Sequence, residues 1–111
     1  DDVSFMPAWV EGAVQTARRL VALFDADTRR TGDTGRTAAN TLRALAAFRQ
    51  RPMLNLRQLC PAAGMTFPTA SKAVERLMRA GIVRELTGRR RNRVFVYDAY
   101  LAILNEGGEP L

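Results

Sequence analysis

The stretch Met65-Thr66-Phe67-Pro68-Thr69-Ala70-Ser71-Lys72-Ala73-Val74-Glu75-Arg76-Leu77-Met78-Arg79-Ala80-Gly81 carries a helix signal at each end. Thr66 suits an N-cap, Pro68 falls in the first turn, where a missing N–H costs little, and Gly81 can adopt the left-handed conformation that stops a helix. At steps of 100° the apolar side chains share one face and the polar ones the other. The segment is therefore predicted to be an amphipathic helix whose core face holds Ala70, Ala73, Val74 and Leu77.

The residues around this helix, from 55 to 96, complete a recognisable pattern. A shorter helix begins at an Asn55 cap and closes at Gly64, with Pro61 predicting a kink or an early end. After the main helix come two β-like runs, at 82–86 and 93–96, joined by the arginine-rich connection 87–92, in which Gly88 and Asn92 tolerate a positive φ. Helix, turn, helix and basic hairpin together predict a winged helix-turn-helix.

The rest of the chain is predicted to form further helices. An amphipathic pattern runs from Pro7 to about Arg30, a loop follows at 31–36, and a second helix runs from about Thr37 to Arg51. Met53 and Leu54 are expected to pair briefly with the wing, and Asp98 to cap a last helix that ends near Glu106. We expect one mainly α domain over 1–111 with a small β-hairpin: a long N-terminal helix at 7–30 and a winged helix-turn-helix at 37–106.

The composition argues against several classes of function. The chain has no histidine and one cysteine, Cys60, so an internal disulfide, a metal site and the common histidine-dependent catalytic arrangements are not expected. We therefore predict no catalytic residue, no metal and no cofactor in this chain. No apolar run reaches the roughly 18 residues of a membrane span, and no secretion signal is evident at the start, so a cytoplasmic location without membrane contact is expected.

The positive charge is concentrated in one segment. Residues 76–93 hold seven arginines and one acid, Glu85, for a net charge of +6, whereas the rest holds ten basic and ten acidic residues. A localised basic patch favours a polyanion or an acidic protein surface as partner. DNA is the polyanion that a winged helix-turn-helix suggests.

The candidate DNA contacts lie on the main helix and on the wing. That helix would enter the major groove, and the wing arginines would hold phosphates or enter the minor groove. The candidate residues are Thr69, Ser71, Lys72, Arg76, Arg89, Arg90, Arg91 and Arg93. Two alternatives stay open: a merely solvated helix face, and arginines that bind acidic groups of a neighbouring domain. Glu75 counts against DNA because its carboxylate repels phosphate.

The first helix is longer than a small winged domain needs. At 1.5 Å per residue it spans about 36 Å, so part of its apolar face should find a partner outside the domain. We expect a homodimer, or docking of another domain, through Trp9, Val10, Ala13 and Val14. Tyr97 and Tyr100 are expected at the edge of the core.

Two stretches resemble Fic proteins, the protein adenylyltransferase family. Residues 9–30, which start Trp-Val-Glu-Gly-Ala-Val-Gln-Thr-Ala, look like the helix after the Fic catalytic core, and residues 81–106, with Thr-Gly-Arg-Arg-Arg-Asn-Arg-Val-Phe, resemble the winged-helix end of the same proteins. The Fic motif His-Pro-Phe-x-x-Gly-Asn-Gly-Arg is absent. The resemblance therefore implies an accessory C-terminal region whose long helix is the remnant of a connection to a Fic core. ATP and Mg²⁺ would be involved only if such a core lies upstream.

Three functions follow from these observations. The first is a non-catalytic winged-helix module of a Fic-like protein, which binds DNA or a protein and regulates the missing core. The alternative is a free-standing dimeric winged-helix transcriptional regulator. The third is a structural domain whose arginine wing docks on the core. The sequence names no DNA site, target protein or effector, and it leaves open the oligomeric state and the activity of a parent enzyme.

Overall fold

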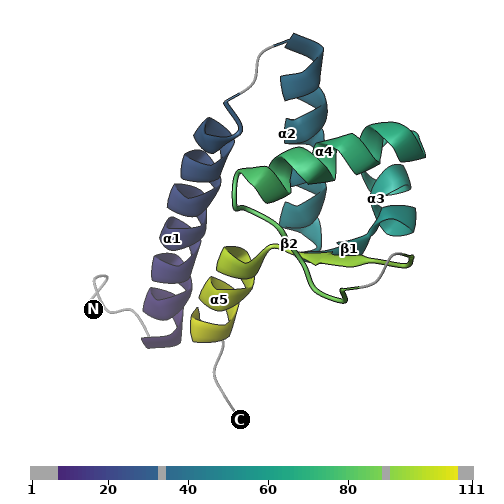
Figure 1. Cartoon of the computed structure of the whole chain (residues 1–111). Helices are drawn as coiled ribbons and strands as arrows, with labels where there is room; N and C mark the ends of the chain where they lie inside the picture. Colours follow the sequence, from purple (N-terminus) through teal and green to yellow (C-terminus); the bar gives the residue numbers. More distant parts are fainter. Residues whose placement is uncertain (1–7, 33–34, 89–90, 108–111) are drawn as a thin grey trace.

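The computed structural model describes residues 8–32, 35–88 and 91–107. Their elements are, in order, α1 (Ala8–Arg30), α2 (Gly35–Gln50), β1 (Met53–Asn55), α3 (Leu56–Ala63), α4 (Phe67–Arg79), β2 (Arg84–Glu85), β3 (Val94–Val96) and α5 (Asp98–Gly107). In Figure 1, α1 and α5 lie side by side and antiparallel, while α2, α3, α4 and the sheet form the body of the molecule beside them.

The sheet has three antiparallel strands in the order β1-β3-β2. Leu54 lies opposite Phe95, which confirms the predicted pairing of this segment with the wing. The strand predicted over 82–86 is shorter, Arg84–Glu85. The reason is that the backbone N–H groups of Ile82 and Val83 donate to the carbonyl of Leu77, at 3.0 and 3.4 Å, and so complete the end of α4 instead of entering the sheet.

The turn between α3 and α4 follows its sequence signals with one exception. Asn55 and Gln58 form a reciprocal capping box with bonds of 2.9 and 2.8 Å, Gly64 has φ +67°, and α3 ends two residues after Pro61. Thr66 has the extended backbone of an N-cap, but its side chain makes no capping hydrogen bond. Gly81 has φ +75° and closes α4 as predicted.

Two further sequence predictions need correction. The second helix begins at Gly35 rather than Thr37 and ends at Gln50. Asp98 was expected to cap the last helix, but it is the first residue of α5, and its carboxylate accepts two hydrogen bonds from Arg84, at 2.6 and 3.1 Å. Arg84 of β2 therefore orients the Asp98 carboxylate, which the sequence predicts to cap the backbone of the last helix.

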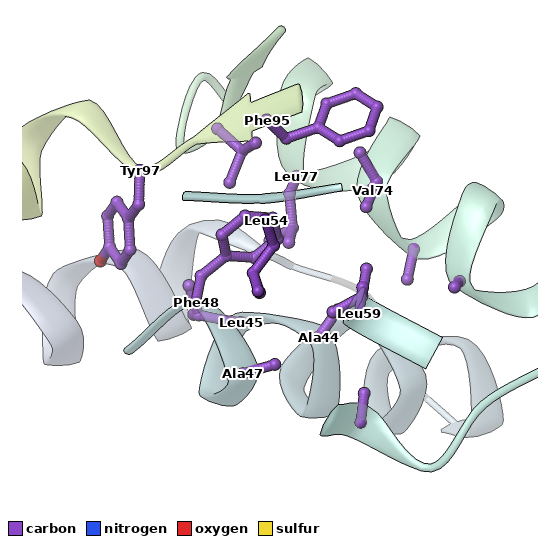
Figure 2. Packing of buried hydrophobic residues seen from close by; sticks show 14 of the residues in the cluster. Ala44, Leu45, Ala47, Phe48, Leu54, Leu59, Val74, Leu77, Phe95 and Tyr97 are labelled. Carbon is purple, nitrogen blue, oxygen red and sulfur yellow. The ribbon is translucent and has the colours of Figure 1, made fainter. Parts of the chain in front are cut away.

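The core lies between α2, α3, α4 and the sheet (Figure 2). Its buried side chains include Phe48 of α2, Leu54 of β1, Leu59 of α3 and Phe95 of β3. The four residues predicted for the core face of α4 are all buried, which confirms the amphipathic interpretation of that helix.

The first helix joins this core through aromatic rings and one buried polar contact. The ring of Phe24 packs against Tyr97 and Tyr100, with centroids 6.1 and 5.2 Å apart. The Tyr97 hydroxyl donates to Asp27 Oδ2 at 2.6 Å, and both residues are almost fully buried. Burial, followed by this bond to Asp27, raises the pKa of Tyr97 well above its usual range. Arg30 donates to Asp27 Oδ1 at 3.1 Å and also to the carbonyl of Ala80 after α4.

Tyr97→Phe is expected to lower the free energy of unfolding by about 1 to 3 kcal/mol, because Asp27 would stay buried without the donor on one of its oxygens. Urea denaturation measures the change. Tyr100→Phe is the matched control, since it removes the same hydroxyl from a half-buried neighbouring ring. Equal effects of the two substitutions would contradict a special role for the bond between Tyr97 and Asp27.

Candidate nucleic-acid interface

The polar face of α4 brings three of its four predicted contact residues together. Lys72 is exposed, and Thr69, Ser71 and Arg76 are half-buried. A hollow of about 190 Å³ is lined by α2 and α4 residues: Thr37, Asn40, Thr41, Thr69, Lys72, Ala73 and Arg76. Ser71 does not line it. The structure thus adds polar side chains of α2 to this face, which the sequence could not place because they lie some thirty residues earlier.

The N-terminus of α4 is open to a ligand of negative charge. The Thr66 hydroxyl donates to Thr69 Oγ1 at 3.1 Å rather than accepting a bond from the helix backbone, and the proline in the first turn brings no N–H of its own. The first turn of a helix carries a partial positive charge and backbone donors that suit phosphate. Together with the adjoining cationic side chains, this end of α4 is suited to a DNA backbone.

The wing places its arginines in different surroundings. Arg91 is exposed, whereas Arg93 is half-buried with its guanidinium carbon 5.2 Å from the centre of the Phe95 ring. Arg89 and Arg90 lie outside the described residues. A second hollow of about 350 Å³ lies between the wing and the starts of α3 and α4, and it is lined by Asn55, Leu56, Arg57, Phe67, Arg91, Asn92 and Arg93. Arg57 and Phe67 were not among the sequence candidates.

Glu85, the one acid in the basic segment, organises the base of the wing. Its Oε2 accepts hydrogen bonds from the backbone N–H groups of Thr87 and Gly88, at 2.8 and 2.7 Å, and from the Thr87 hydroxyl at 2.5 Å. The Thr87 hydroxyl bond is the largest cause of a lowered pKa of Glu85, and the positive charge of Arg93 contributes. The carboxylate therefore fixes the turn at Thr87 and Gly88, at the base of the wing.

The outer face of α1 keeps an exposed apolar surface. Val10 is half-buried, Ala13 and Val14 are exposed, and the side chain of Trp9 lies outside what the structure describes. A shallow hollow of about 480 Å³ is lined by Val14, Ala17, Arg18, Val21, Ala22 and Asp25. α5 covers another face, where Arg19 pairs with Glu106 at 2.7 Å. The apolar surface therefore extends further along α1 than the four residues predicted from the sequence.

Within residues 8–32, 35–88 and 91–107 there is no cluster of three or more acidic or cysteine side chains that could hold a metal ion. Among the helices described, none has the length and apolar character to cross a membrane.

Comparison with known proteins adds likenesses of fold. No protein-family model matches the chain, and no curated protein matches it. The solved structure of RV1404 from Mycobacterium tuberculosis aligns with a TM-score of 0.50 and 16% identity, covering 96% of this chain and 77% of that one. A MarR family transcriptional regulator from Silicibacter pomeroyi aligns with a TM-score of 0.49 and 25% identity, over 86% of this chain and 66% of its own. The transcriptional regulator PA4135 aligns with a TM-score of 0.48 and 20% identity, covering 92% of this chain and 74% of that one.

The architecture is therefore that of a winged helix-turn-helix preceded by a long helix, as predicted. The comparisons give the resemblance to Fic proteins no support.

The wing turn is expected to respond to acid through Glu85. Because the folded pKa of this carboxyl lies below its usual 4.5, its stabilising effect is present above that pH and is lost as pH falls through the lower folded value. NMR should show the amide protons of Thr87 and Gly88 shifting together over this range. In Glu85→Gln the same resonances should not change with pH over this range. If they still shift in the variant as they do in the original protein, Glu85 is not the group that titrates.

Proposed function

We propose that this chain is a winged-helix transcriptional regulator that binds duplex DNA with α4 and the wing. The observation that carries the proposal is the position of the charge excess: all seven arginines of residues 76–93 belong to the second half of α4, to β2 or to the wing that follows. In this arrangement α4 enters the major groove, and the wing contacts the neighbouring backbone.

The arginines of this segment would divide between two tasks. Arg84 is paired with Asp98, and Arg93 stacks on Phe95, so both help to hold the wing unit together. Arg79 and Arg91 are exposed and suited to phosphate oxygens. Glu75, exposed on α4, opposes phosphate but can accept a hydrogen bond from the amino group of cytosine. Lys72 and Thr69 would contact base edges or the adjacent DNA backbone.

The free-standing regulator is preferred over the accessory module of a Fic-like protein. The exposed Arg91 of the wing and the exposed apolar face of α1 supply the two surfaces that a DNA-binding dimer requires. The predictions that the chain needs no cofactor, and that it acts in the cytoplasm, stay predictions.

The salt dependence of DNA binding tests the first part of the proposal. Fluorescence anisotropy on a labelled duplex should give a negative slope of log K against log salt, to which each phosphate contact contributes about −0.9. Arg91→Ala should reduce the magnitude of the slope by about 0.9, one phosphate contact. Arg51→Ala is the matched control, since this exposed arginine precedes β1 at the end of the sheet away from the wing tip. Failure to bind any duplex at low salt would exclude the proposal.

We further propose that two copies associate through the exposed face of α1. Val21, 59% exposed, and Val14, 37% exposed, lie with Ala17 and Ala22 in one shallow apolar hollow flanked by Arg18 and Asp25. A charge of each sign beside an apolar strip can pair with its counterpart in a two-fold arrangement. A dimer would present two copies of α4 to half-sites about one helical turn apart.

Val21→Asp should convert the dimer to a monomer, because the new carboxylate would be buried without a partner in the interface. Sedimentation velocity measures the change, and the melting temperature should stay close to that of the original protein since Val21 is exposed in the single chain. Met53→Asp, at an exposed position of β1, should leave the dimer intact. A monomeric original protein would refute this association.

A further inference from the structure

Phe67 is an exposed aromatic residue at the start of the helix that faces the proposed DNA. It is the first residue of α4, and 59% of its surface is accessible. The buried face of the helix is complete without it, since Ala70, Ala73, Val74 and Leu77 contact the core. A single exposed apolar side chain is ordinary on a protein surface, so the surroundings of Phe67 decide whether it has a role.

Those surroundings combine apolar and polar side chains around one hollow. Phe67 and Leu56 supply the apolar part of the hollow of about 350 Å³, and Asn55 at the end of β1, Arg57 of α3 and the wing residues Arg91, Asn92 and Arg93 supply the rest. Arg57 and Arg91 are exposed beside it. Guanidinium groups bind phosphate well, and an aromatic ring packs well against an apolar group. A ligand that fits both would carry an apolar group close to a phosphodiester. A basic or uncharged protein segment would gain nothing from the charges of Arg57 and Arg91.

The major groove offers one such apolar group. Thymine carries a C5-methyl at the groove edge, and Phe is one of the side chains that contact it in DNA-bound proteins. The first turn of a recognition helix is the part that meets base edges. The ring of Phe67 stands at this turn, next to the uncapped backbone of α4 and to the cationic wing.

We propose that Phe67 contacts the C5-methyl of a thymine in the major groove and makes the protein prefer thymine at one position of each half-site, with Arg57 and Arg91 holding the flanking phosphates. This inference rests on the proposed function. It assigns sequence discrimination to an apolar contact, in addition to the polar residues of α4.

The test uses the full chain and DNA that differs by methyl groups alone. Duplexes bound by the protein are selected from a random pool, and each thymine of the selected sequence is replaced in turn by deoxyuridine. At one thymine of each half-site the affinity should fall by about fourfold, the value of one buried methyl group. Phe67→Ala should bind the thymine duplex about as weakly as the original protein binds the deoxyuridine duplex. The variant should no longer distinguish thymine from uracil at that position.

Two further variants separate the methyl contact from a general loss of function. Phe67→Leu keeps an apolar side chain and should retain part of the discrimination. Met53→Ala removes another exposed apolar side chain, on β1, and should leave the thymine preference unchanged. A thymine preference that survives Phe67→Ala, or equal affinity for thymine and uracil duplexes at every position, would overturn this inference while DNA binding itself stands. Absence of binding to any duplex would overturn the proposed function and the inference with it.

Discussion

The buried hydrogen bond between Tyr97 and Asp27 fixes how the long first helix sits on the winged unit. The tyrosine follows β3 directly and the aspartate lies one turn before the end of α1, so a 2.6 Å contact joins residues seventy positions apart. Arg30 continues the link, because it contacts both Asp27 and the carbonyl of Ala80 at the end of α4. From the other side, Arg49 of α2 donates to Thr28 Oγ1 at 2.7 Å and lies over the Phe24 ring. The end of α1 is therefore bound to α2, to the end of α4 and to the end of β3.

This anchoring of α1 fixes the relative orientation of two surfaces that are separate in the fold. The exposed apolar strip lies along the middle of α1, whereas the basic surface belongs to α4 and the wing. If two copies associate through α1, the angle between α1 and α4 sets the distance between the paired recognition helices. Half-sites on B-DNA repeat at about 34 to 36 Å, so a small rotation of α1 would move α4 out of register. A buried polar contact resists such rotation better than apolar packing alone, because its donor and acceptor must stay within hydrogen-bonding distance.

Local signals in the sequence were enough to predict the helix-turn-helix. The Asn55 cap, the left-handed glycines 64 and 81 and the apolar face of α4 depend on neighbours within a few residues, and each was confirmed. Two features that the sequence does not predict depend on partners far away in the chain. Asp98 pairs with Arg84 rather than serving as a cap, and the bond between Tyr97 and Asp27 joins two elements at opposite ends of the chain. The polar pattern of α4 predicts DNA contacts without Phe67, whose surroundings form only once α3, α4 and the wing are assembled.

The wing shows how a strongly basic segment can stay ordered at its base. Arginines repel one another, and a flexible hairpin would lose conformational entropy on binding. Here Glu85 accepts three hydrogen bonds from Thr87 and Gly88, and Arg93 lies against Phe95, so the base of the wing is held by contacts within the protein. Beyond this base, Arg91 is exposed. Contacts of such arginines with phosphate supply affinity that is independent of sequence and sensitive to salt. Under the proposed function, discrimination between bases would come from the first turns of α4, where Phe67, Thr69 and Lys72 offer an apolar ring, a hydroxyl and an ammonium group within about one and a half turns of helix.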